Sequence, residues 1–133
     1  MMDIYVYRGK RIDNGEWVRG FAQPFGMYGL LDGIHCKNEC GGHQTVKIDP
    51  DTLGQCTWKR DQNGLLIYEG DVLDYYGTLL VVEWRKDCWR AWEIHENGIY
   101  GLNARLSDYY AITPPKIIGN IHDNPELLEA GNG

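Results

Sequence analysis

The chain of 133 residues carries a formal net charge of −6, and 43% of its residues are hydrophobic and 24% charged. This composition is typical of a folded protein with one domain or two small subdomains, and it disfavours nucleic-acid binding through overall charge. No stretch approaches the ~20 apolar residues of a membrane span, and the N-terminus lacks a signal-peptide pattern. We therefore expect a cytoplasmic protein without membrane contact, whose four cysteines are reduced thiols.

The first half of the chain predicts strand pairs joined by turns. Residues 4–22 are rich in Tyr, Val and Trp on both sides of Asp13-Asn14-Gly15, a sequence typical of a tight hairpin turn. Residues 26–48 are rich in glycine and predict a second, looser strand pair with a long loop. Residues 48–55, IDPDTLGQ, predict one helical turn that Asp49 caps and Gly54 ends.

The second half predicts a small antiparallel sheet structure. A turn over residues 61–64 precedes an apolar run, a sharp bend at Glu69-Gly70-Asp71 and an alternating strand near residues 78–84. Asn124 and Pro125 are typical of the start of a short C-terminal helix. Several short strands with turns about every 8–12 residues indicate a barrel or a sandwich.

Four segments resemble the signature segments of a known family. They are RGKRIDNGEWVRG, IDPDTLGQCT, DQNGLLIYEGDVL and IIGNIHDNPELLE, in this order along the chain. They are similar to the YopX family, small proteins encoded by bacteriophages and prophages, and the resemblance extends from about Tyr7 to Glu129. It implies a mainly β protein whose later part is an SH3-like barrel, and it supplies no catalytic or binding residues.

The expected architecture combines the pattern with this resemblance. We predict a mainly β fold in which residues 1–57 form an N-terminal β-hairpin region. Residues 58–133 are expected to form a small SH3-like β-barrel with a short C-terminal helix.

The segment HCKNECGGH, residues 35–43, places cysteines and histidines close together. Cys36, Cys40 and His43, with Cys56 as a fourth ligand, are the candidate set for a zinc ion, because zinc requires about four N or S ligands. The second closely spaced ligand pair of a structural zinc site is missing, however. A glycine-rich exposed loop that holds two thiols explains the segment better, so we predict no metal and no cofactor.

Glu69 and Asp71 are paired carboxylates that allow two interpretations. They could act as general acid and base or bind Mg²⁺. The stronger interpretation is a barrel corner, in which Gly70 permits the bend and the two acids stay solvated and bond nearby backbone N–H groups. No group of residues combines a nucleophile, a base and an orienting partner, so we predict no catalytic residues and no enzyme.

Basic residues alternate with aromatic residues in the N-terminal hairpin. Arg8, Lys10, Arg11 and Arg19 are the candidate nucleic-acid-binding residues, because cations and rings together can follow a single strand. Acidic residues in the same hairpin and the net charge oppose this hypothesis.

The densest aromatic region contains Trp84, Trp89 and Trp92, which are the candidate protein-interface residues. Trp89 and Trp92 are three positions apart, so a straight strand cannot place both on one side. An outward tryptophan is a frequent anchor of protein interfaces.

These observations favour a phage or prophage accessory protein of the bacterial cytoplasm that acts by protein–protein contact. We expect it to form a homo-oligomer, because strand edges that carry neither charge nor proline invite pairing, or to bind an unknown phage or host protein. The first alternative is a nucleic-acid-associated protein of phage replication or host takeover. The second alternative is a zinc-binding protein.

Overall fold

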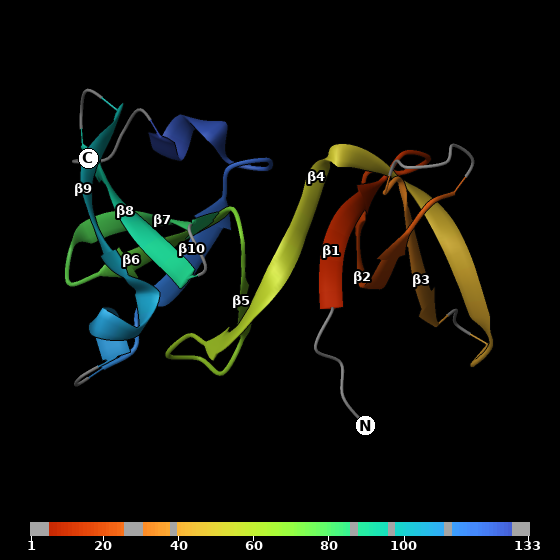
Figure 1. The fold of residues 1–133 in the computed structure, drawn as a ribbon, viewed down its shortest axis with the longest axis horizontal. Helices are drawn as coiled ribbons and strands as arrows, with labels where there is room; N and C mark the ends of the chain where they lie inside the picture. The colour runs from red at the N-terminus through yellow and green to blue at the C-terminus, as the bar shows by residue number, and fades with distance from the viewer. Residues whose placement is uncertain are drawn as a thin grey trace. The chain divides into compact units, whose positions relative to one another are not determined.

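The computed structural model describes residues 6–25, 31–37, 40–85, 88–95, 98–110 and 113–128. In this part the chain is mainly β, as predicted, and its strands form two antiparallel sheets (Figure 1). The chain divides into two compact units, Met1–Cys56 and Thr57–Gly133. The boundary predicted from the sequence lies after residue 57, one residue later than the observed division.

The first unit consists of antiparallel strands whose sheet closes partly on itself. Its elements are β1 (Val6–Arg11), β2 (Trp17–Gln23), β3 (Gly33–Lys37) and most of the long strand β4 (His43–Arg60). The strands pair in the order β1-β2-β3-β4, and β1 also pairs with β4 (Figure 1). The four strands therefore form a partial ring.

The N-terminal hairpin is confirmed. β1 and β2 pair from Val6↔Phe21 to Lys10↔Trp17, and the turn between them has Gly15 at φ 74°. This left-handed conformation is one that glycine adopts without strain. The looser second pair is confirmed as well, since β3 pairs with the start of β4 over residues 33–37 and 43–47.

The core of the first unit is small and lies on the inner face of the partial ring. Ile34, Val46 and Ile48 are buried there. Glycines permit the close approach of the strands around them. A Cβ atom added to Gly20 would overlap the carbonyl oxygen of His35, a backbone atom that cannot move aside easily.

The predicted helical turn at residues 48–55 is wrong, because this segment is part of β4. β1 draws the segment into the ladder by pairing Lys10 with Asp49 and Arg8 with Gly54, and the residues in between bulge out of register. The Asp49 carboxylate does accept the N–H of Asp51, as a cap would. The Thr52 hydroxyl bonds both to β1 and to the Asp49 carbonyl, so tertiary pairing overrides the local signal.

The second unit contains the other sheet and two short 3₁₀ segments. Its strands are β5 (Leu66–Tyr68), β6 (Asp71–Tyr75), β7 (Thr78–Arg85), β8 (Cys88–His95), β9 (Gly98–Arg105) and β10 (Lys116–Asn120). The sheet order is β10-β6-β7-β8-β9, while β5 pairs with the end of β4 (Figure 1). The 3₁₀ segments are η1 (Leu106–Tyr110) and η2 (Pro125–Leu128). Where a short C-terminal helix is predicted, the described residues form the 3₁₀ segment η2, and the SH3-like barrel stays a prediction.

Apolar side chains cover the second sheet on both faces. The cluster on one face is Ile67, Leu73, Leu80, Val82, Ala91 and Leu106. The cluster on the other face is Val72, Val81 and Ile94, against which Trp92 and Leu127 pack. Because successive side chains of a strand point to opposite faces, the continuous apolar runs of β6 and β7 supply both clusters.

A buried carboxylate organises one corner of the second unit. Asp61 is buried, and one of its oxygens accepts the N–H groups of Asn63 and Leu65, at 2.9 Å each. The other oxygen accepts the N–H of Ile117 in β10, at 3.0 Å. The carboxylate therefore fixes the predicted turn after β4 and ties it to a strand 56 residues away. Nearby, burial and the charge of Asp61 raise the pKa of Tyr110 to about 12.

Asparagine side chains shape the segment after β10 in the same way. The Asn120 side-chain oxygen accepts the N–H groups of His122 and Asp123, and the Asn124 side-chain oxygen accepts the N–H of Asn120. A Cβ atom at Gly119 would lie 2.5 Å from this Asn124 oxygen. These local hydrogen bonds stabilise the turn before η2.

We predict that Gly20→Ala destabilises the protein far more than Gly41→Ala. The first change forces a methyl group against the His35 backbone and is expected to reduce the free energy of unfolding by about 3 kcal/mol. Gly41 has φ +85° and nothing within 4 Å of an added Cβ, so Gly41→Ala adds only backbone strain of about 1 kcal/mol. Urea unfolding curves measure both values, and equal effects would contradict the close approach of β2 and β3.

We predict that Asp61→Ala reduces the free energy of unfolding by about 3 kcal/mol, because it leaves three backbone N–H groups without their acceptor. Glu126→Gln is the matched control, because Glu126 is an exposed carboxylate on η2, and it should change stability by less than about 0.5 kcal/mol. Thermal and urea unfolding provide the comparison. A tolerated Asp61→Ala variant would show that water replaces the carboxylate.

Candidate functional site

The histidines and one cysteine of residues 35–43 lie on opposite faces of the β3–β4 hairpin. His35 pairs with Thr45, and Lys37 pairs with His43, so both histidines point away from the core. Their rings stack, with centroids 5.4 Å apart and planes 4° from parallel. Cys36 alternates to the inner face, where it packs against the core of the first unit.

The structure does not bring the candidate zinc set together. Cys40 is exposed in the turn before β4, whereas Cys56 is buried near the end of the first unit. All four cysteines lie within the described residues, and none of them is in a disulfide. Across the described ranges, no group of three or more His, Cys, Asp or Glu side chains could hold a metal ion. The arrangement of Cys36, Cys40, His43 and Cys56 therefore offers no ready-made metal centre.

Three of the four basic candidates of the N-terminal hairpin share one face. Arg8 is opposite Arg19 and Lys10 is opposite Trp17 in the β1–β2 ladder. The Arg8 guanidinium lies 4.6 Å from the centre of the Trp17 ring, and the Lys10 ammonium lies 5.6 Å from it. Arg8 is only 5% exposed, so its charge is less accessible than the sequence suggests.

Arg11 is separated from the other three cations. Its Nε and one terminal nitrogen donate to the Asp13 carboxylate at 2.9 and 2.8 Å, which is a bidentate ion pair. The hydrogen bond between the two groups raises the pKa of Arg11 and lowers the pKa of Asp13. Arg11 is therefore neutralised locally and is a weak candidate for phosphate binding.

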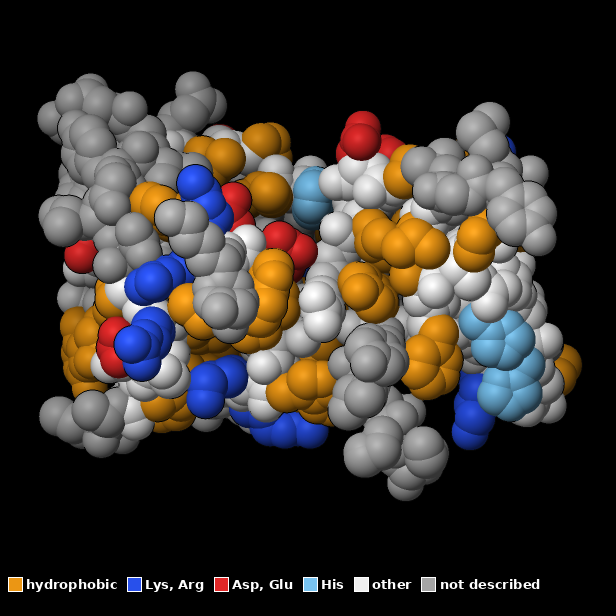
Figure 2. All heavy atoms as spheres, in the orientation of Figure 1, with side chains coloured by type: hydrophobic (Ala, Val, Ile, Leu, Met, Phe, Trp, Pro, Cys, Tyr) orange, Lys and Arg blue, Asp and Glu red, His pale blue; other side chains and the backbone are white. Residues whose placement is uncertain are grey.

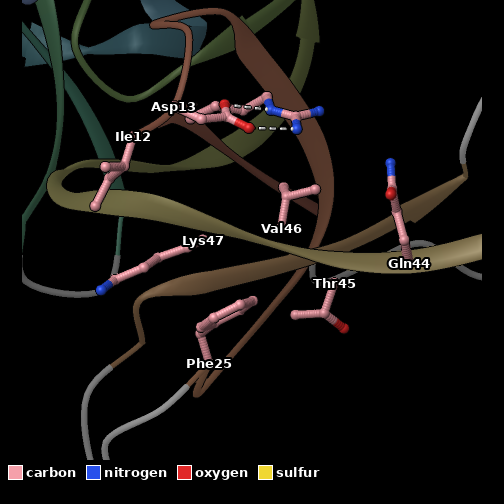
Figure 3. A pocket seen from close by; sticks show the side chains of 8 residues that line it. Ile12, Asp13, Phe25, Gln44, Thr45, Val46 and Lys47 are labelled. Carbon is pink, nitrogen blue, oxygen red and sulfur yellow. Dashed lines mark hydrogen bonds and ion pairs between the residues drawn. The ribbon is translucent and has the colours of Figure 1, made fainter.

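A shallow hollow of about 390 Å³ lies beside this ion pair. Its lining residues are Arg11, Ile12, Asp13, Phe25, Gln44, Thr45, Val46 and Lys47 (Figure 3). Ile12 and Phe25 are large apolar side chains exposed to solvent. The hollow combines apolar walls with one ammonium group, which suits a weak surface contact better than acid–base chemistry.

The three candidate tryptophans separate as alternation requires. Trp84 and Trp89 are opposite each other in the β7–β8 ladder, and their rings meet edge to face with centroids 5.1 Å apart. Trp92 is opposite Val81 on the other face and packs in the cluster there. Trp89 packs against the first cluster. Trp84 is 45% exposed and is the tryptophan of this group with the most accessible ring.

The bend at Glu69-Gly70-Asp71 is a structural corner. Gly70 has φ +91°, its N–H bonds to the carbonyl of Val82, and its own carbonyl accepts the N–H of Ile121. Asp71 accepts the N–H of Tyr68 at 2.8 Å. The sequence interpretation is right about this bonding and wrong about solvation, since Asp71 is only 1% exposed.

No helix in the described ranges is long and apolar enough to cross a membrane.

The comparisons with known proteins concern the fold and the family. The crystal structure of protein EF1440 from Enterococcus faecalis is similar to this chain, with a TM-score of 0.54 and 21% sequence identity, over 96% of this chain and 100% of that one. At this identity the likeness concerns the fold alone. None of the curated proteins compared matches the chain. A family model described as YopX protein matches residues 6–129, so the chain belongs to the YopX family.

Proposed function

We propose that the chain is a non-enzymatic phage or prophage accessory protein that acts by protein–protein contact and self-associates through the surface around Trp84. The phage or prophage setting is part of the proposal and follows from what the resemblance to the YopX family implies; the family model that matches residues 6–129 supports the family itself. The observation that carries the proposed contact is the exposed ring of Trp84, held edge to face against Trp89.

A tryptophan held in this way is well suited to an interface. The contact with Trp89 restricts the Trp84 rotamers before any partner binds, so little side-chain entropy remains to be lost on association. Burial of a large aromatic ring contributes more to the binding free energy than burial of most other side chains does. Aromatic residues therefore dominate interface hot spots.

The structure favours a contact between side chains over strand pairing. In the first unit, β1 pairs with both β2 and β4, so its two edges are occupied. In the second sheet, the outer strands β9 and β10 each show a register shift in their ladders. Such bulges twist an edge and oppose the addition of another strand.

The buried acids support a binding protein over an enzyme. Asp61 and Asp71 are buried carboxylates that an acid–base mechanism would use first. Both accept hydrogen bonds from backbone N–H groups, and these bonds stabilise turns. These bonds stabilise the fold and leave the carboxylates directed at the backbone rather than at a cleft.

We predict that the wild-type chain forms an oligomer that Trp84→Ala weakens by at least about tenfold in dissociation constant. Native mass spectrometry and light scattering over a concentration series measure this constant. Ile118→Ala is the matched control, because Ile118 is an exposed apolar side chain of the same sheet, on β10, and its removal should leave the oligomer intact. Circular dichroism would verify that both variants fold.

A wild-type chain that stays monomeric at about 100 μM would contradict self-association, since even weak specific contacts of this kind would be populated there. An oligomer that Trp84→Ala leaves unchanged would instead place the contact on another surface.

A further inference from the structure

The outer face of the first unit collects residues from three strands that pair side by side. It is defined by the side chains of β2, β3 and residues 43–47 that alternate away from the Ile34–Val46–Ile48 core. The ladders place them in register, from Phe21↔His35 on one side to His35↔Thr45 on the other. The side chains of this outer face are Trp17, Arg19, Phe21, Gln23, His35, Lys37, His43, Thr45 and Lys47.

The charge of the outer face is opposite in sign to that of the whole chain. Arg19, Lys37 and Lys47 are exposed cations there. None of the outer-face positions in β2, β3 and residues 43–47 is Asp or Glu, and the nearest acid of β4 on this side is Asp49, two positions beyond Lys47 and opposite Lys10. Figure 2 shows histidine side chains gathered at the surface over the first unit, with a Lys or Arg side chain beside them. The net charge of −6 therefore hides a local cationic surface.

Flat rings form a row across the same face. Phe21 is 43% exposed and lies opposite His35, and His35 stacks on His43 with ring centroids 5.4 Å apart. The Thr45 hydroxyl contacts Nδ1 of His35 at 3.2 Å and accepts a bond from the Gln23 amide at 2.7 Å. These contacts orient the His35 ring before any ligand binds, which reduces the entropy lost on binding.

We propose that this outer face binds single-stranded nucleic acid. Arg19, Lys37 and Lys47 would neutralise phosphates, and the rings of Phe21, His35 and His43 would stack on unpaired bases. Exposed rings among cations on a sheet surface suit a single strand, because its bases present their faces, whereas the bases of a duplex are stacked on one another. An acidic protein segment would satisfy the cations but would leave the row of rings without a matching partner.

The proposal differs from the one that the sequence alone suggests. It excludes Arg11, because the charge of Arg11 is paired with Asp13, although both residues line the hollow that Lys47 also lines. It adds Phe21, Lys37 and Lys47 to the candidate set. It is independent of the self-association proposed above, because Trp84 belongs to the second unit.

The first measurement is fluorescence anisotropy of a labelled oligo-dT of about 20 nucleotides, titrated with the full chain. Three phosphate contacts predict a slope of about −2 when the logarithm of the binding constant is plotted against that of the salt concentration. A duplex of equal length should bind at least about fivefold more weakly, because its bases cannot stack on the protein. Absence of binding at 50 mM salt and about 100 μM protein would overturn the proposal.

Charge-changing variants distinguish binding at the outer face from a general effect of net charge on binding. Lys37→Glu and Lys47→Glu should each weaken binding at least about fivefold and make the salt slope less steep. Lys116→Glu reverses an exposed cation of β10 in the second unit. This control and Trp84→Ala should leave binding unchanged. Equal loss in all variants would overturn the assignment to this face.

The role of the rings has its own test. Phe21→Ala should weaken oligo-dT binding at least about fivefold, and Phe21→Tyr should restore it, because tyrosine retains the stacking face. Heparin, which has anionic groups but no bases, should bind the Phe21→Ala variant as well as it binds the wild-type chain. An equal loss of heparin and oligo-dT binding in Phe21→Ala would show that the change disturbs the fold, and no loss of either would overturn the stacking of bases on Phe21.

Discussion

The double pairing of β1 is the constraint on which the first unit depends. β1 bonds to β2 along one edge and to the long strand β4 along the other, and β3 joins β2 to the start of β4. This partial ring gives every strand one inner and one outer face. A one-residue shift of any ladder would exchange the two faces, which is why the small core of Ile34, Val46 and Ile48 specifies the register so strongly.

The same alternation decides which chemistry each residue can perform. Cys36 and His35 are adjacent in the sequence, yet the strand turns the thiol toward the core and the imidazole toward solvent. Neighbours that look like metal ligands are thereby separated. Conversely, Phe21 and His35 are far apart in the sequence and become direct neighbours across a ladder. Proximity along the chain is therefore a poor guide to a site on a sheet, and register is a good one.

Sequence reasoning succeeded where the determining interactions are local. The hairpin at Asp13-Asn14-Gly15 and the turn over residues 61–64 follow from residues that accept turn conformations, and the separation of Trp89 from Trp92 follows from strand periodicity. It failed where distant residues decide. The segment IDPDTLGQ has the local signals of a helical turn, but β1 recruits it as a strand. Burial of Asp71 and the outer face of the first unit also depend on pairings that no short window contains.

The net charge of the whole chain is a poor guide to the charge of a single site. Residues 1–56 contain 6 Lys+Arg and 7 Asp+Glu, and residues 57–133 contain 7 and 12, so both units are acidic in total. Yet acids of the first unit such as Asp13 and Asp32 lie in turns or bond to the backbone, while the outer-face positions of β2, β3 and residues 43–47 carry only cations, rings and neutral polar groups. Because screening limits exposed charges to a range of about 10 Å, a ligand responds to the nearest residues more than to the total. A chain of net negative charge can therefore present a surface for phosphates, provided that its fold sorts acids and bases onto different faces.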